Sequence, residues 1–313
     1  MNGNFTMNGS KTGTTSFALN GSPISLTGTF NIAPNVDAVQ EFKVMTNTWD
    51  AAIGRTGGGA VNTSIKAGTN SFHFTAGEFI RNRVFDANTT QLNAASQPRG
   101  KHNVNQISLT AGGPIRKNKD FIFGSIEMWR ERVPFSVVAS VPTADLRNGQ
   151  GFSTVPSNIF DPLTSHTCVA KTDGVSSCSS TYIRNPFPGN FIPESRISPI
   201  GKKVLSYFPA QNYPGQVNNY VADTGGIYRY DQPIVRWDHV FDDYNRLNVL
   251  TSYQWGQEFR NSTGIPGEGA SGNIWTRRQP ISISADYTHF SHTYIFDVRM
   301  SFSRFSRRFP TST

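Results

Sequence analysis

The sequence predicts an all-β protein, and three observations support this fold class. Apolar residues make up 36% of the 313 residues, and the chain is rich in Gly (28), Pro (18) and Phe (23), as is typical of strands joined by turns. From residue 71 onward apolar and polar residues alternate, which is the period of a two-faced β-strand. No run approaches the roughly 18 apolar residues of a membrane-spanning helix, but a spanning β-barrel needs no such run.

Six segments carry the alternation most clearly, and a seventh strand is expected over 121–130, where both faces are apolar near its start. One face of the six strands is almost entirely apolar, whereas the interleaved positions are mostly polar or charged. The six segments are 72–76, 107–111, 235–241, 247–255, 281–287 and 294–302. The sequence therefore predicts about seven antiparallel strands.

The opposite face of these strands, formed by the interleaved positions, carries charged residues in mid-strand. In a soluble β-sandwich this charged face would meet water. In a transmembrane barrel the apolar face meets lipid, and the charged face lines a wet lumen. The charged residues expected to face the lumen are Arg236, Asp238, Asp286, Asp297 and Arg299.

The connections between the expected strands alternate in length, and this favours the barrel. They are long at 82–102, 131–230 and 257–279, and short at 114–119, 242–245 and 290–293, where Asp242 and Asp243 indicate turn chemistry. Outer-membrane barrels have short periplasmic turns and longer extracellular loops. We therefore predict a transmembrane antiparallel β-barrel with a long extracellular loop over about 131–230.

The first 70 residues follow a different pattern. Residues 34–44 predict one helical turn opened by Asn35 or Asp37, followed by a strand. The glycine cluster at 57–59 resembles a phosphate-binding loop but lacks the Lys-Ser/Thr pair that would reach phosphate and metal. An ordinary flexible turn is the alternative explanation of these glycines.

As a set, several segments resemble TonB-dependent outer-membrane transporters, most closely the Oar-like branch. The resemblance covers roughly residues 17–305 and rests on segments 34–44, 54–62, 66–73, 109–119, 121–127 and 230–239. It implies that residues 1–70 are the C-terminal part of an α/β plug domain. Residues 71–313 would then be the N-terminal strands and loops of the barrel.

The same resemblance implies a function in transport across the outer membrane of a Gram-negative bacterium. The parent protein would bind a solute at the cell surface and import it with energy transmitted by the TonB–ExbB–ExbD system. Family barrels have about 22 strands, so about seven strands would form a partial transmembrane antiparallel β-barrel. The chain is then expected to be an internal fragment that lacks the signal peptide and the TonB box. Its implied partners are outer-membrane lipid, an unidentified solute and TonB, which would act through the missing N-terminal part.

The resemblance also implies how the plug would be seated. Gly57, Gly58 and Gly59 are expected to let plug backbone pass close to the barrel wall, where a side chain would clash. Arg55 and Glu41 are expected to pair with charges of the lumen. An exported protein passes through an oxidising compartment, so we also expect a disulfide between Cys168 and Cys178 in the long loop. Two unpaired cysteines are the alternative.

Other classes of function find little support. The net charge is +8, but lysines and arginines are spread along the chain, so no nucleic-acid partner is expected. The six histidines lack metal-ligand spacing, and no Ser/His/Asp arrangement is recognisable, so we predict no enzyme and no cofactor. Two alternatives stay open: a secreted or surface β-sandwich adhesin, and a plug-less porin, against which residues 34–70 argue.

Overall fold

The structure is a computed structural model in which the chain forms two compact units. One unit comprises residues 1–134, 225–260 and 274–313, and the other comprises 135–224 and 261–273. The structure describes residues 7, 9–11, 13–24, 32–46, 57–88, 90, 93, 99–133, 136–154, 157–170, 172–173, 177–178, 180–223, 225–261 and 273–309.

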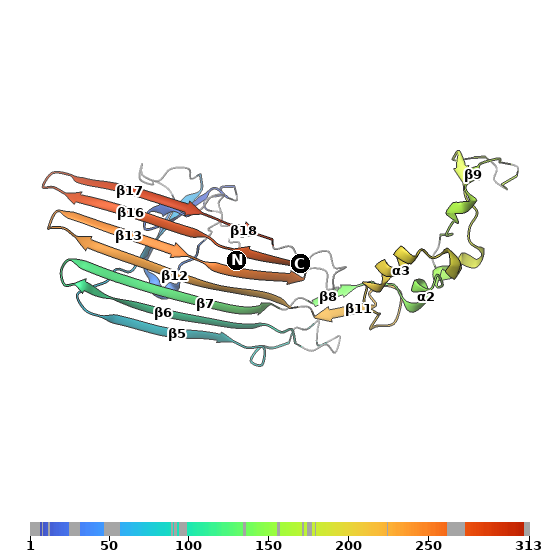
Figure 1. The fold of residues 1–313 in the computed structure, drawn as a ribbon, viewed down its shortest axis with the longest axis horizontal. Helices are drawn as coiled ribbons and strands as arrows, with labels where there is room; N and C mark the ends of the chain where they lie inside the picture. The colour runs from blue at the N-terminus through green and yellow to red at the C-terminus, as the bar shows by residue number, and fades with distance from the viewer. Residues whose placement is uncertain are drawn as a thin grey trace. The chain divides into compact units, whose positions relative to one another are not determined.

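A large antiparallel sheet of ten strands dominates the first unit (Figure 1). Its strands are β5 (His73–Arg81), β6 (Asn103–Arg116), β7 (Asp120–Val133), β12 (Gly226–Val240), β13 (Asn245–Tyr253), β14 (Trp255–Asn261), β15 (Asn273–Arg278), β16 (Ile281–Phe290), β17 (Ile295–Arg304) and β18 (Arg307–Arg308). β13 and β14 pair with β12 in one common register and are interrupted only at Gln254. β15–β16 and β17–β18 continue one another in the same way. In the described residues the ten strands thus form seven long ones, and the predicted partial barrel is confirmed.

The register places the predicted faces as the alternation indicated. Trp237 lies opposite Ile122 on β7 and Val249 on β13, and Val249 lies opposite Ala285 on β16. We call this the apolar face. Its further members are Phe74, Ala76, Ile107, Leu109, Ala111, Ile126, Val235, Leu247, Ile281, Ile283, Tyr287, Phe296, Val298, Met300 and Phe302. The seventh strand, whose facing the sequence left open, directs Ile122 to this face and Phe123 to the other.

Burial is the reverse of that in a soluble sandwich. On the apolar face Phe74 is 72% exposed and Met300 is 73% exposed. On the opposite face, which we call the polar face, Ser108, Ser252 and Asp286 are all buried. A sheet that exposes its apolar side chains and covers its polar ones suits a surrounding of lipid rather than water.

The connections alternate in length as predicted. The short ones are 117–119, 241–244 and 291–294, and the long ones are 82–102, 134–225 and 262–272. In the second short turn, Asp242 Oδ1 accepts hydrogen bonds of 2.8 Å from the backbone N–H groups of Tyr244 and Asn245, so the predicted turn chemistry is confirmed.

Two long connections are shorter than the sequence indicated. β7 and β12 stay paired as far as Val133 and Gly226, and β14 and β15 extend into the segment expected to be a loop at 257–279. At the ends of β7 and β12 the apolar-face positions carry Arg130 and Arg229, which lie opposite each other. Strand pairing persists there although the alternation ends, because backbone hydrogen bonds do not require an apolar face.

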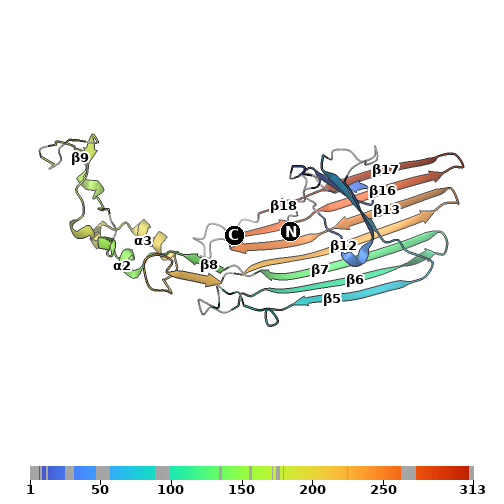
Figure 2. The ribbon, with the colours of Figure 1, turned by 180° about the vertical axis from the view of Figure 1, so that it is seen from behind.

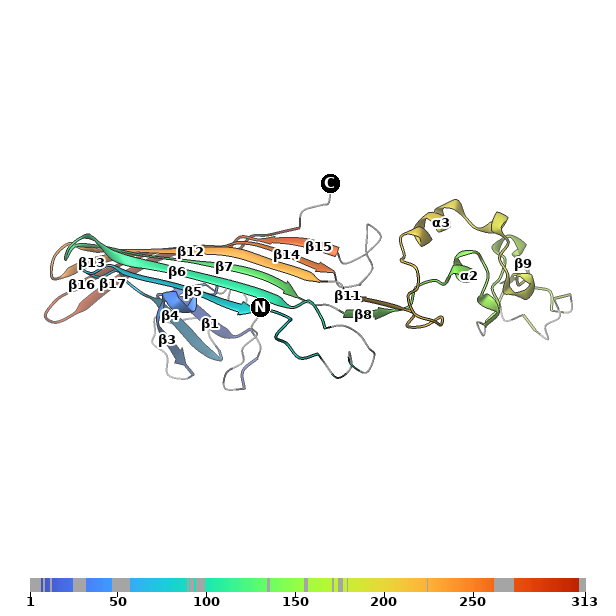
Figure 3. The same cartoon turned by 90° about the horizontal axis from the view of Figure 1, so that it is seen from below.

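A small four-stranded sheet covers the polar face of the large sheet (Figures 2 and 3). Its order is β2 (Ser22–Pro23), β1 (Thr15–Leu19), β4 (Gly59–Ile65) and β3 (Val39–Met45), with β1 parallel to β4. The short 3-10 helix η1 (Val36–Ala38) precedes β3, and the Asn35 side chain caps it by accepting from Asp37 N at 2.9 Å. The predicted helical turn followed by a strand is confirmed.

One apolar core joins the two sheets. Leu19, Val61 and Ile65 of the small sheet pack in the same buried cluster as Ile234 and Leu250 of the large sheet. Ile234, Leu250 and Phe123 lie on the polar face, where they give the small sheet apolar contacts among mostly polar side chains. Side-chain hydrogen bonds between the two sheets add polar contacts.

Most of the second unit lies in the chain between β7 and β12. It contains the strand pairs β8 (Ser136–Ala139) with β11 (Tyr220–Asp223) and β9 (His166–Thr167) with β10 (Tyr182–Ile183), and the helices α2 (Ala144–Arg147) and α3 (Pro199–Ser206). Four 3-10 helices complete it: η2 (Phe152–Thr154), η3 (Pro162–Thr164), η4 (Pro188–Asn190) and η5 (Glu194–Arg196). The Arg147 guanidinium donates to the carbonyls of Leu205 and Pro209 at 2.7 Å each, which ties α2 to the end of α3.

Candidate functional site: the polar face of the large sheet

Side chains of the polar face bind backbone carbonyls of the small sheet and its flanks. Gln232 Nε2 donates to the Ala33 carbonyl at 2.7 Å, and Arg236 Nη1 donates to the Ile65 carbonyl at 2.6 Å. Ser303 Oγ donates to the Pro23 carbonyl at 3.3 Å. In these three contacts the acceptor is a backbone carbonyl, so they depend on the backbone conformation of the small sheet and its flanks and not on their side chains.

The most buried polar contact between the two sheets lies at η1. Asn35 Nδ2 donates to Ser108 Oγ at 2.6 Å, and Ser108 Oγ donates to Asp37 Oδ2 at 2.5 Å. Asn35 and Ser108 are 2% and 1% exposed, respectively. Lys66 Nζ donates to the backbone carbonyl of Asp37 at 2.8 Å, so a cation also contacts this residue. Leaving a buried polar group of this network without its hydrogen-bond partner costs free energy, so the network favours a single position of η1 on β6.

Glycines permit close backbone approach between the two sheets at two positions. A Cβ at Gly68 would lie 2.5 Å from the Ile122 carbonyl oxygen and 2.8 Å from the Gly113 carbonyl oxygen, which are backbone atoms and cannot turn aside. A Cβ at Gly21 would collide with the Arg299 guanidinium. Gly68 lies within one of the segments that carry the family resemblance, but the sequence alone assigned it no role.

The glycine cluster at 57–59 acts elsewhere than expected. A Cβ at Gly57 would contact Thr14, one at Gly58 would collide with Ser10, and one at Gly59 would lie 2.5 Å from Met7 Sδ. All three neighbours belong to the N-terminal segment and not to the large sheet. The expectation that these glycines pass close to the barrel wall is therefore corrected, and Gly68 and Gly21 make that approach instead.

The charged residues predicted to share a lumen face do so, and they pair with one another. Arg236 binds Asp238, with Nη2 2.7 Å from Oδ1, and both lie on β12. Arg299 Nε lies 2.7 Å from Asp286 Oδ2, and its Nη2 lies 3.7 Å from Asp297 Oδ1. Opposite charges on neighbouring strands of one face satisfy each other locally.

Of the two plug charges expected to pair with them, the structure describes Glu41, which has a different partner. Glu41 lies exposed on β3, where it accepts a hydrogen bond from Ser64 Oγ at 3.3 Å. This corrects the expected pairing of Glu41 with the wall, because Ser64 belongs to the same small sheet. Arg55 lies outside the described residues.

The polar face continues towards the long connections as a cluster of aromatic and acidic side chains. Trp129 stacks on Tyr230 with ring centroids 6.0 Å apart, and Trp129 Nε1 donates to Glu131 at 3.0 Å. Tyr230 donates to Glu127, and Glu131 accepts from His102 at 3.1 Å when the ring N carries a proton. The sequence missed this cluster, which we call the aromatic wall, because Glu131 and Tyr230 fell within the expected loop at 131–230. The alternation of Tyr228, Tyr230 and Gln232 was the available signal.

In the second unit, Cys168 and Cys178 form a disulfide with a Cα–Cα separation of 5.9 Å. His166 and Asp173 are paired beside it, with His166 Nε2 3.0 Å from Asp173 Oδ1. Hydrogen bonds to the Thr164 carbonyl and to Asp173 raise the pKa of His166, and bonds from Val169 N and His166 lower the pKa of Asp173. The disulfide and the ion pair close overlapping stretches of the same loop.

Two other kinds of feature are absent from the described residues. No group of three His, Cys, Asp or Glu side chains there is placed to hold a metal ion. Within the same residues, no helix has the length and apolar character needed to cross a membrane.

Comparison with known proteins identifies the family of this sheet. Residues 64–313 match the model of the outer membrane beta barrel domain, which is more than half of the chain. The chain belongs to this family. It is therefore an outer-membrane protein, and the apolar face is the side that meets lipid. A search of the curated proteins finds no match.

Two solved structures share the fold. The outer membrane transporter YddB from Escherichia coli matches with a TM-score of 0.56 and 7% identity over 94% of this chain and 31% of its own. The siderophore receptor PirA from Acinetobacter baumannii matches with a TM-score of 0.52 and 10% identity over 94% of this chain and 32% of its own. The chain thus spans about a third of the length of these proteins.

Proposed function

We propose that this outer-membrane barrel chain is part of a TonB-dependent transporter that imports a solute into the periplasm, with the small sheet as the C-terminal part of its plug. The observation that carries the proposal is the small sheet bound on the polar face. A barrel that only had to anchor a surface domain would not need a second sheet inside its wall. The fold shared with an outer membrane transporter and a siderophore receptor supports the same conclusion.

The contacts of the plug suit a part that must move. They include hydrogen bonds from wall side chains to plug carbonyls, as at Gln232, Arg236 and Ser303. Each such bond contributes about 0.5–1.5 kcal/mol, or about 1.5–3 kcal/mol where one partner is charged. A pulling force from TonB could break them one at a time and let them reform, because each contributes only a small free energy.

The aromatic wall supplies the surface on which a solute would rest before passage. Trp129 and Tyr230 offer flat apolar rings, and Glu127, Glu131 and His102 offer hydrogen-bonding groups around them. Such mixed surfaces bind organic molecules by stacking and by directed polar contacts. We propose no chemical step on the solute, no enzymatic activity and no cofactor.

The plug-less porin is the second candidate, and the small sheet argues against it. The β-sandwich adhesin is disfavoured by the inverted burial of the large sheet, and the family match contradicts a soluble sandwich. The Oar-like branch rests on the sequence segments named above and stays part of the proposal.

Planar-bilayer conductance of the full-length protein tests the plug. We expect a closed channel at rest that opens reversibly when urea loosens the small sheet, and an open channel when residues 1–70 are deleted. A large conductance at rest in the parental protein would overturn the plug and favour the porin.

Maleimide labelling of a Ser108→Cys variant in growing cells tests the use of TonB. Ser108 is buried under Asn35 and Asp37, so the thiol should react in cells with TonB and stay protected in cells without it. Asn88→Cys, in the long connection 82–102, is the control and should label equally in both strains. Equal labelling of Ser108→Cys in both strains would contradict energised plug movement while leaving the plug itself intact.

A further inference from the structure

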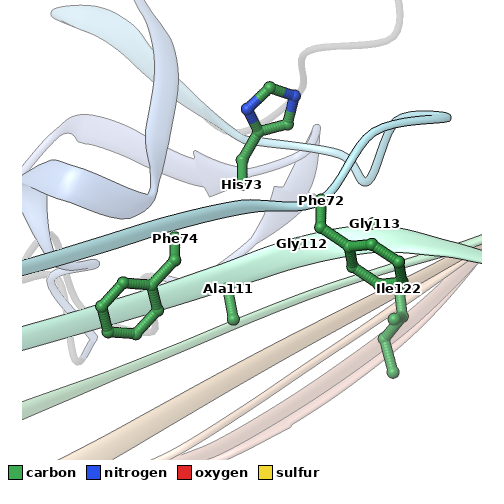
Figure 4. Close-up of a pocket in the computed structure, with 7 residues that line it drawn as sticks. All are labelled: Phe72, His73, Phe74, Ala111, Gly112, Gly113 and Ile122. Atoms are coloured by element: carbon green, nitrogen blue, oxygen red, sulfur yellow. The ribbon is translucent and has the colours of Figure 1, made fainter.

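A pocket of about 290 Å³ opens on the lipid-facing side of the sheet near the short turn between β6 and β7. Its lining residues are Phe72, His73, Phe74, Ala111, Gly112, Gly113 and Ile122 (Figure 4). Phe74 pairs with Ala111, and Gly113 pairs with Ile122, so all four lie on the apolar face. In the close-up, the side chains of Phe74, Ala111 and Ile122 point to one side of the sheet and His73 points to the other.

Small residues on β6 line this pocket. Residues 111–113 are Ala-Gly-Gly, and Gly113 lets the ring of Phe72 lie against β6, because a Cβ at Gly113 would collide with that ring. Phe72 and Phe74 are 82% and 72% exposed and lie beside these small residues. Apart from His73, which points away, the lining side chains are hydrocarbon, so the pocket suits a hydrocarbon chain.

The adjoining turn is cationic. Arg116, Lys117 and Lys119 occupy the end of β6 and the turn, and all three are exposed. The carboxylate of Asp120 binds Arg116 and also lies 2.6 Å from His239 Nδ1, so it neutralises part of this charge. Lys117 and Lys119 leave the turn positive beside an apolar pocket. The other two short turns, 241–244 and 291–294, contain no Lys or Arg.

We propose that this pocket and turn form a binding site for an acidic phospholipid of the periplasmic leaflet. One acyl chain lies over Ala111–Gly113 between Phe72, Phe74 and Ile122, and Lys117 and Lys119 bind the phosphate. The pocket opens towards the bilayer on the apolar face, which favours a membrane lipid over a soluble anion. The positive charge of Lys117 and Lys119 favours an acidic headgroup over a zwitterionic one. The proposal needs the short turns to be periplasmic but does not depend on transport.

Photo-crosslinking of the full-length protein in vesicles tests this site. A benzophenone amino acid replaces Phe72, and the vesicles contain phosphatidylglycerol as a minor component of phosphatidylethanolamine. We expect phosphatidylglycerol to form about five times or more its share of the crosslinked lipid, since one lysine near an acidic membrane surface corresponds to about a fivefold preference. Replacing Phe296 in the same way gives the control, because Phe296 lies on the same face beside a turn without lysine. It should crosslink lipids in proportion to their abundance.

The double variant Lys117→Gln/Lys119→Gln should return the Phe72 crosslinks to that proportion. The matched variant Lys202→Gln/Lys203→Gln removes the same charge from α3 in the other unit and should leave the enrichment unchanged. Lipid crosslinks at Phe72 that follow abundance in the parental protein, or enrichment that survives loss of both turn lysines, would overturn the site.

Discussion

The Ser108 hydroxyl donates a 2.5 Å hydrogen bond to the carboxylate of Asp37, a residue that lies 71 positions earlier in the chain. The bond joins β6 of the large sheet to η1 of the small sheet at a position that is almost free of solvent. We predict that Ser108→Ala loosens the small sheet by about 1–3 kcal/mol, because Asp37 and Asn35 both lose a partner in a buried place. Hydrogen exchange of β3 and β4 should quicken accordingly.

Ser303→Ala is the control for this variant, since Ser303 makes a longer bond of 3.3 Å to Pro23 at an exposed site. It should change the opening free energy measured by hydrogen exchange in the small sheet by less than about 0.5 kcal/mol. Equal effects of the two substitutions would show that the Ser108 network does not hold the small sheet.

Gly68→Ala should destabilise the junction between the small sheet and β5 by about 1–3 kcal/mol through overpacking. The added Cβ meets backbone oxygen atoms of Ile122 and Gly113, which can yield only if two strands of the wall shift. Gly201→Ala, within α3, meets nothing closer than 3.8 Å and favours a helix, so it should be neutral or slightly stabilising. Thermal unfolding of the purified full-length protein measures both, and a neutral Gly68→Ala would refute the close approach.

The two faces of β17 should respond differently to charge. Met300→Arg places a cation on the lipid-facing side in mid-strand and should cost about 2–4 kcal/mol of insertion free energy, whereas Phe296→Arg, beside the short turn, should cost about 0–1 kcal/mol. Asp297→Asn on the polar face should leave insertion intact and alter only its contacts with Arg299 and Thr288. Folding titrations into vesicles would report these values. A larger cost for Phe296→Arg than for Met300→Arg would contradict the assigned depth.

The alternating connections predict which ends lie outside the cell. A cysteine replacing Asn88, in the long connection 82–102, should react with an impermeant maleimide on intact cells. A cysteine replacing Asn245, at the start of β13 beside the turn 241–244, should react only after the outer membrane is broken. Ser262, which would report on the third long connection, lies outside the described residues. The reverse labelling pattern would invert the topology and the leaflet of the proposed lipid site.

The pairing of Cys168 with Cys178 should be present in protein purified from outer membranes. Closing a ring between two positions ten residues apart contributes about 2–3 kcal/mol in the chain-entropy model. Because the bond lies in the second unit, its reduction should speed proteolysis of 166–183 and leave the large sheet unaffected. Mass spectrometry without reducing agent measures the bond directly, and free thiols at both positions would exclude it.

The sequence by itself determined the features of this protein that depend on local chemistry. Arg236 and Trp237 could be assigned to opposite faces because successive strand residues point in opposite directions whatever they touch. Asp242 could be assigned to a turn because its carboxylate binds backbone only two and three residues ahead. Asn35 could be expected to open the helical turn for the same reason.

Only the tertiary structure decided what the polar face holds. Asn35 meets Ser108 across 73 residues and Gln232 meets Ala33 across 199 residues, and no periodicity reports on such distances. The glycines illustrate the difference: the cluster at 57–59 stood out in the sequence, but Gly68 is the one that approaches backbone atoms of β6 and β7 in the described residues. The residue type determines which contacts a position permits. Which neighbour makes such a contact depends on how segments far apart in the chain pack together.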